Sequence, residues 1–292
     1  MLLQAVGDGL VVGLTYALVG LGFGLIYQTG RFFHLAHASV YTWGAYAAWF
    51  LAARLLTPLP VAMLLGAVFA GALGSATEIV VYAPLRRRGH DSLDLLVASL
   101  GLMIVLGSAI PLLFGDQTRS LRNGAINPTL TFAGLRFTSA QLLIVGAAVS
   151  LYALGYVALF RTRIGLAVRA VRANPALAAS SGIDPDSVMR WVFAVGSGLA
   201  GVAAVCVALD LDLRPTMGFQ ALLLGAVAVI VGGIGTLQGA LVGGLVVGEA
   251  HEVAGLLIGP QWADLISFGL LLVVLLIRPT GLVGARRRRP AA

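Results

Sequence analysis

Lysine is absent from this sequence of 292 residues, and all 19 basic residues are arginine. A phosphate-binding P-loop requires the lysine of its GxxxxGK[ST] motif, so the chain cannot bind ATP through such a loop. Schiff-base catalysis by a lysine amine is excluded for the same reason. If the protein uses the energy of ATP, another chain has to supply it.

Cysteine is nearly absent as well, since Cys206 is the single thiol and lies in an apolar run. One thiol cannot form an intrachain disulfide or a thiolate metal site. The HExxH, GxSxG and paired-aspartate motifs are missing, which argues against a membrane-embedded enzyme. No basic face is interleaved with exposed aromatic residues, so nucleic acid is not an expected partner. We therefore expect no catalytic residue, no cofactor and no metal.

Charged residues make up only 11% of the chain, whereas 59% of residues are hydrophobic. An average soluble domain carries about 25% charged residues. This composition predicts an all-α, polytopic transmembrane helical bundle, with residues 1–292 forming one integral membrane domain. The best count is nine spans, with eight or ten left open, at about 9–27, 40–53, 60–82, 93–114, 140–160, 191–209, two within 219–258, and 262–277.

The arginines also predict an orientation. With a cytoplasmic C-terminus and nine spans, 14 of the 19 arginines fall on the inner side, as the positive-inside rule requires. The N-terminus is then outside, and residues 285–292 form a basic cytoplasmic tail whose natural counterpart is anionic membrane lipid. No basic residue precedes Arg31, so the first span is expected to stay in the membrane and not to be removed as a signal peptide.

The longest polar interruption in the second half of the chain is 161–190, with five arginines and two aspartates. Its alanine-rich sequence favours helix, and Asn174 and Pro175 divide it into two short helices, with Asn174 as the cap of the second. Gly182 is expected to end that helix, and Asp184 begins a turn. The segment is either a loop that follows the charge rule or a docking element for a cytoplasmic partner.

A second polar stretch, 27–46, separates the first two apolar runs. His34 and His37 are three residues apart and would share one helical face. Two histidines without a nearby carboxylate or cysteine are a weak metal signal. We interpret this stretch as a polar kink or a re-entrant element that lines a cavity, where irregular backbone is tolerated inside a membrane.

Acidic residues are few within the predicted spans, and Glu249 and Glu252 share a helical face of the eighth span. They line the pathway or a subunit interface, or they are neutral, hydrogen-bonded carboxyls that fix helix packing. Gly235, Gly239 and Gly243 recur every four residues and would form one stripe, either for close packing or beside the pathway. A stand-alone secondary transporter of a small polar solute that uses Glu249 and Glu252 is one functional hypothesis.

Four motifs, in order, resemble another class of protein. Four segments are similar to segments of branched-chain amino acid ABC transporter permeases. They are GLTYALVGLGFGLIYQTG followed by HLAHASVYTWGAY, RTRIGLAVRAVRANPALAASSGI, GGIGTLQGALVGGLVVGEA and the terminal RPTGLVG. The resemblance covers nearly the whole chain, and it is nearest to the shorter of the two permease types of the leucine/isoleucine/valine importer. One departure lies at 34–38, where HLAHA stands in place of the usual Asn-Phe-Ala-His-Gly. A different solute, such as another amino acid, urea or a short amide, is compatible with that change.

This resemblance implies a transport subunit of a bacterial plasma (inner) membrane importer and not an enzyme. Its implied partners are two cytoplasmic ATP-binding subunits, a second permease subunit expected to be a paralogue, and an extracytoplasmic substrate-binding protein. The resemblance also assigns 161–190 as the cytoplasmic coupling loop that contacts an ATPase. The coupling residues would be Arg169, Ala170, Arg172, Asn174, Pro175 and Gly182. The residues expected at the pathway or subunit interface are His34, His37, Glu249, Gly235 and Gly239.

Overall fold

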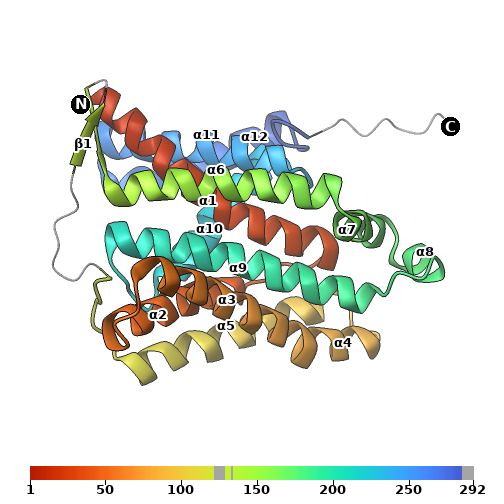
Figure 1. The fold of residues 1–292 in the computed structure, drawn as a ribbon. Helices are drawn as coiled ribbons and strands as arrows, with labels where there is room; N and C mark the ends of the chain where they lie inside the picture. The colour runs from red at the N-terminus through yellow and green to blue at the C-terminus, as the bar shows by residue number, and fades with distance from the viewer. Residues whose placement is uncertain (122–128, 133, 285–292) are drawn as a thin grey trace.

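The computed structural model describes residues 1–121, 129–132 and 134–284. Arg122 and the predicted basic tail 285–292 lie outside the described residues. The chain forms a bundle of long helices that run back and forth between two ends (Figure 1). The N-terminus and a small hairpin lie at one end, and two short helices, α7 and α8, lie at the other.

The described elements follow one another in a simple order, and two of the helical ones are not α-helices: η1 is a π-helical turn, and η2 is a 3-10 turn. Their bounds are α1 (Leu2–Gly30), α2 (His37–Arg54), α3 (Leu59–Thr77), η1 (Glu78–Tyr82), α4 (Ala83–Arg87), α5 (Ser92–Phe114), β1 (Thr129–Phe132), β2 (Leu135–Thr138), α6 (Ser139–Arg161), α7 (Arg163–Ala173), α8 (Pro175–Ser180), α9 (Pro185–Leu211), α10 (Met217–Gly232), α11 (Leu237–Leu257), η2 (Pro260–Trp262) and α12 (Ala263–Ile277).

Within the described residues, seven helical segments are long and apolar enough to cross a bilayer. They are α1, the continuous run α3–η1–α4, α5, α6, α9, α11 and the run η2–α12. The count of nine spans is therefore not confirmed, because it also requires α2 and α10 to cross. Helix α10 has only 16 residues, and α2 has 18 residues that include His37, Ser39 and Thr42.

Helix α1 is the core of the bundle, since most of its length is buried against α11, α9 and α10. Its glycines permit this closeness: a Cβ atom at Gly13 would lie 2.8 Å from the Cα atom of Leu245 in α11. A Cβ atom at Gly20 would lie 2.8 Å from the carbonyl oxygen of Gly225 in α10. Small residues that let two backbones approach are the usual basis of helix packing in lipid.

Polar caps mark the ends where the sequence changes from loop to helix. Asp91 accepts hydrogen bonds from the backbone N–H groups of Leu93 and Asp94, and a capping box starts α5 there. Thr138 and Gln141 form a second capping box at the start of α6. The strands β1 and β2 form a short antiparallel hairpin before α6, with Thr129 opposite Thr138.

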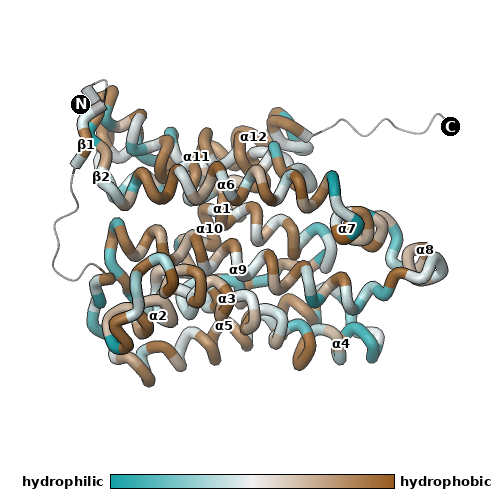
Figure 2. Tube along the Cα trace, viewed as in Figure 1, coloured by the Kyte–Doolittle hydropathy of each residue, from teal (hydrophilic) through white to brown (hydrophobic). Residues whose placement is uncertain are grey.

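The distribution of hydropathy agrees with a bundle that crosses a membrane. In Figure 2 the hydrophobic colours run along the helices, and hydrophilic colours gather at the two ends, notably around α4 and the start of α7. Large apolar side chains on α5, α6 and α12 are exposed, including Leu112, Val149 and Leu276. Such exposure is costly in water and is normal for surfaces that face lipid or another membrane subunit.

Candidate coupling segment and membrane cavities

The segment 161–190 folds as its sequence predicts. The side chain of Thr162 caps α7, and Asn174 Oδ1 accepts hydrogen bonds from Ala176 N and Leu177 N at 3.0 and 3.2 Å to cap α8. Gly182 follows α8 with a φ of 82°, a conformation that favours glycine. Asn174, Pro175 and Gly182 thus hold α8 as a separate short helix beyond the end of α7 (Figure 1).

Asp184 then caps α9 by accepting hydrogen bonds from Asp186 N and Ser187 N. The hydroxyl of Ser187 also donates to Asp184 Oδ2 at 2.6 Å. This hydroxyl contact is the main reason why the pKa of Asp184 lies below its ordinary value, and the two backbone N–H groups add to it. The carboxylate form of Asp184 therefore fixes the point at which the chain re-enters the bundle.

The two arginines assigned to coupling point into the molecule. Arg169 Nη1 donates to the carbonyl oxygen of Leu159 at 2.6 Å, and its guanidinium lies 5.4 Å from the ring centre of Phe160. Arg172 Nη2 donates to the carbonyl oxygen of Gly235 at 2.9 Å, and burial lowers the pKa of Arg172. Ala170 is partly buried and packs beside the core. The large apolar side chains that the segment exposes are Ile164 and Leu166 on α7 and Leu177 on α8.

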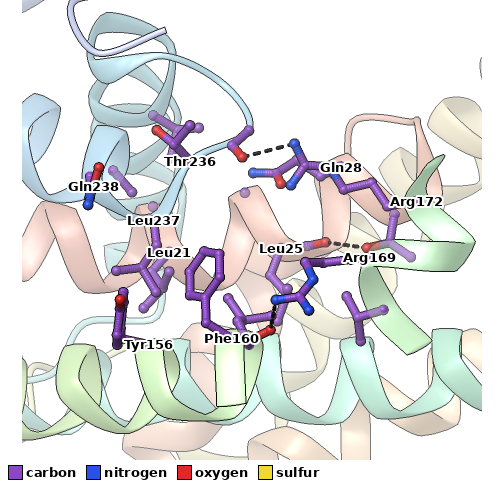
Figure 3. Close-up of a pocket in the computed structure, with 18 residues that line it drawn as sticks. Leu21, Leu25, Gln28, Tyr156, Phe160, Arg169, Arg172, Thr236, Leu237 and Gln238 are labelled. Carbon is purple, nitrogen blue, oxygen red and sulfur yellow. Dashed lines mark hydrogen bonds between the residues drawn. The ribbon is translucent and has the colours of Figure 1, made fainter. Parts of the chain in front are cut away.

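Arg169 and Arg172 line an inner cavity of about 460 Å³ between α1, α6, α7 and α11 (Figure 3). Its polar residues are the two arginines with Gln28, Thr29, Thr236 and Gln238, and its apolar wall includes Leu21, Leu25, Tyr156, Phe160 and Leu237. No carboxylate lines the cavity among the described residues. Sequence reasoning did not find this cavity, because its walls come from four separate parts of the chain.

An outer cavity of about 480 Å³ lies on the opposite face of α1. Tyr16 lines the outer cavity and Leu25 lines the inner one. These residues are nine apart, which is two and a half helical turns, so their side chains leave α1 on opposite faces. The outer cavity has mixed charge: its lining includes Asp210, Asp212, Arg214, His251 and Glu252. It also includes Tyr41, whose buried hydroxyl has no hydrogen-bond partner in the described part of the chain.

The two histidines of the polar stretch are fully buried, and they do not share a helical face as predicted. His34 precedes α2, whereas His37 is its first residue, although their rings are only 5.8 Å apart. His34 Nδ1 lies 3.0 Å from the hydroxyl of Tyr82 and 3.4 Å from Ser99 Oγ. The histidines pack in the core and are absent from the linings of the inner and outer cavities.

The irregular segment 31–36 does fold back into the bundle. The ring of His37 lies 6.3 Å from that of Phe23, although α1 continues to Gly30. The seven residues of α1 from Phe23 to its end at Gly30 correspond to about 10 Å, so α2 begins at a point about that far from the end of α1. This arrangement agrees with the interpretation of a re-entrant element. The segment 31–36 itself lines neither cavity, but Gln28 and Thr29 of the same polar stretch line the inner cavity and Tyr41 lines the outer one.

The predicted glycine stripe is wrong at its first position. Gly235 lies in the turn before α11 with a φ of 117°, so it cannot share a helical face with Gly239 and Gly243. Gly239 does pack closely, since a Cβ atom there would lie 2.6 Å from the carbonyl oxygen of Gly233. The role of Gly235 in this structure is to offer its carbonyl oxygen to Arg172.

The two glutamates of α11 occupy different surroundings. Glu249 lies against Gly9 of α1, where a Cβ atom would be 2.7 Å from Glu249 Oε2. Glu252 lines the outer cavity, next to His251, which lies 3.7 Å from Asp264. Glu252 is therefore the better placed of the two to meet a solute in the outer cavity.

Sequence reasoning missed a buried ion pair at the same end of the molecule as α7 and α8. Glu78 has no exposed side-chain surface, and both of its oxygens accept from Arg86, with Nη1 to Oε2 at 3.2 Å. The predicted third span ends at about residue 82, but α4 extends the helical run to Arg87. Arg87 in turn donates to Asp186 in the first turn of α9 at 2.7 Å.

Comparison with known proteins identifies the class. The model of the branched-chain amino acid transport system permease component family matches residues 5–275. The chain belongs to this family. The permease protein BraD of the high-affinity branched-chain amino acid transport system of Pseudomonas aeruginosa is 32% identical, over 97% of this chain and 95% of its own. The LivH permease protein of Salmonella typhimurium is 30% identical over the same shares.

A solved structure shows the same fold as this permease. PsaBC from Streptococcus pneumoniae, in complex with Fab, superposes with a TM-score of 0.55 and 11% identity, over 94% of this chain and 92% of that one. The helical permease fold and the family resemblance predicted from the sequence are thus confirmed.

Proposed function

We propose that this permease is the membrane-spanning subunit of an ATP-binding-cassette importer that moves branched-chain amino acids into the cytoplasm. The relatives are named as permeases for that solute class, and their similarity covers nearly the whole chain. ATP would be hydrolysed by separate subunits, in agreement with the absence of lysine from the sequence. Family membership favours this function over a stand-alone secondary transporter.

The observation that supports it best is the shape of α7 and α8. A short, capped helix that projects from one end of the bundle offers a rigid surface to a groove on a partner. Leu177 on α8 is 64% exposed, although α8 lies beyond the membrane-spanning helices. An apolar side chain there is explained by contact with another protein. We assign the docking contact to α8, with Asn174, Pro175 and Gly182 holding it in place.

The orientation follows from the same assignment. If α8 meets an ATPase, the end of the bundle with α7, α8 and α4 is cytoplasmic, and the N-terminus with the hairpin faces outward. The outer cavity would then face the substrate-binding protein and receive the amino acid. Its acidic groups suit the ammonium of an amino acid, and Arg214 suits the carboxylate. A second permease subunit, expected to be a paralogue, would complete the pathway in the plasma membrane.

The test compares two exposed leucines at opposite ends of the bundle. Leu177→Asp should reduce co-purification of the ATP-binding subunits at least tenfold and abolish ATP-dependent leucine uptake in proteoliposomes. Leu55→Asp is the matched control, because Leu55 is 60% exposed in the turn after α2. It should leave the ATPase association unchanged. Equal association and uptake in both variants would refute the docking assignment, and absence of ATP-dependent leucine uptake by the unmodified complex would refute the function.

A further inference from the structure

We propose that the inner cavity binds the headgroup of an anionic phospholipid. Two guanidinium groups from α7, Arg169 and Arg172, lie at its polar end (Figure 3). Both side chains are partly buried, and neither has a carboxylate within 4.0 Å in the part of the chain that the structure describes. The proposal rests on the proposed function in two respects: the solute is an amino acid, and this end of the bundle is cytoplasmic.

The two arginines keep most of their hydrogen-bonding capacity. Each guanidinium carries five N–H donors in a planar fork. Arg169 uses one to reach Leu159, and Arg172 uses one to reach Gly235. Partly buried cations are normally neutralised by an opposite charge, and the fork geometry of arginine matches the oxygens of a phosphate. The site therefore lacks an anion that its donors are arranged to bind.

The remainder of the cavity has the character expected around an acyl chain. Helices α6 and α11 both pack against α1, and the cavity lies between them. Tyr156 and Phe160 line it from α6 and are about half exposed, so the cavity is open at the side that faces the membrane. Leu21 and Leu237 make the deeper wall apolar. Basic pockets between membrane helices on the cytoplasmic side are typical binding sites for anionic headgroups.

The charge of the lining distinguishes a lipid from the transported amino acid. An amino acid would bring an ammonium group next to two arginines, and no carboxylate of the described lining could compensate for it. A phosphodiester such as that of phosphatidylglycerol carries only negative charge at neutral pH. The phosphate of the lipid would lie between Arg169 and Arg172, and its acyl chains would extend past Phe160 and Tyr156 into the bilayer.

Bound lipid would act on the coupling segment, because both arginines belong to α7. The experiment measures lipid retained by the purified full-length permease after it is equilibrated with phosphatidylglycerol in mild detergent, with phosphatidylcholine as the neutral comparison. Native mass spectrometry counts the bound molecules. Each arginine near an anionic headgroup contributes on the order of fivefold in affinity. Arg169→Gln/Arg172→Gln should therefore lower the affinity for phosphatidylglycerol by about 25-fold.

Two further variants make the result specific. Arg161→Gln/Arg163→Gln removes two exposed arginines, at the end of α6 and the start of α7, and should retain the lipid within twofold of wild type. Arg169→Lys/Arg172→Lys keeps both charges and should retain most of the binding, which separates a charge effect from misfolding. Undiminished phosphatidylglycerol binding in the glutamine variant would overturn the proposal. It would also be overturned if that variant kept the lipid and lost bound radiolabelled leucine, which would assign the cavity to the solute.

Discussion

The ion pair between Glu78 and Arg86 gives a sharp test of the energetics of the bundle. Arg86 lies eight residues after Glu78, and Glu78 is the first residue of the π-helical turn η1. Glu78 is 0% exposed and Arg86 is 24% exposed, so the pair is largely removed from water. Arg86→Met would leave the carboxylate buried without its partner. Breaking one side of a buried pair costs about 3–5 kcal/mol, and the partial exposure of Arg86 places our expectation near the lower value.

The neighbouring arginine is the matched control. Arg87 also pairs with a carboxylate, that of Asp186, but it is 71% exposed. An exposed pair contributes about 0–1 kcal/mol, so Arg87→Met should change the free energy of unfolding by no more than that amount. The double variant Glu78→Gln/Arg86→Met removes both charges, and it should be at least 1 kcal/mol more stable than Arg86→Met alone.

The free energy of unfolding can be measured by titrating the permease with sodium dodecyl sulfate in mixed micelles. The four tryptophans supply the fluorescence signal. The reasoning would be refuted if Arg86→Met and Arg87→Met lost the same stability. The reasoning would also fail if Glu78→Gln/Arg86→Met lost as much free energy of unfolding as Glu78→Gln and Arg86→Met lose together as single variants.

Two other predictions concern the cap of α8 and the contact between α1 and α11. Asn174→Ala removes the side-chain acceptor for Ala176 N and Leu177 N and should destabilise α8 by about 1 kcal/mol. Hydrogen exchange of these two amides should then accelerate about fivefold, and Asn174→Asp should restore most of the protection. Gly248→Leu forces a side chain into Gly13 of α1 and should cost about 1–3 kcal/mol in mixed-micelle unfolding. Gly101→Leu, on an open face of α5, should be nearly neutral; equal losses in both variants would contradict the packing described.

Much of the fold could be predicted because apolar length and capping residues are local signals. The expected start of the fourth span at 93 and its end at 114 agree with α5 (Ser92–Phe114), where Asp91 supplies the cap. The cap at Asn174 was predicted correctly for the same reason. Local signals do not show depth, so the apolar runs of α2 and α10 predict two spans, although α10 has only 16 residues and the 18 residues of α2 include polar side chains.

The errors arise where three-dimensional contacts override a spacing. Gly235 has the four-residue spacing of a helix, yet the backbone turns there with positive φ. The pair Glu78–Arg86 lies outside the three- and four-residue spacings of a helix, and hydropathy does not indicate the π turn that begins at Glu78. The sequence of α7 places arginines three residues apart, but only packing shows that Arg169 and Arg172 donate to carbonyl oxygens of the bundle.

Arg172 has a mechanical consequence for the whole bundle. Its guanidinium donates to the carbonyl oxygen of Gly235, and its own carbonyl oxygen accepts from Arg31 Nη2 at 3.1 Å. One residue of α7 is thus tied both to the end of α1 and to the turn that joins α10 and α11. Any displacement of α7 must either break two hydrogen bonds or carry these two elements with it. A movement of the segment between α6 and α9 is therefore transmitted both to α1 and to the glycine turn before α11. The segment does not move independently of these two elements.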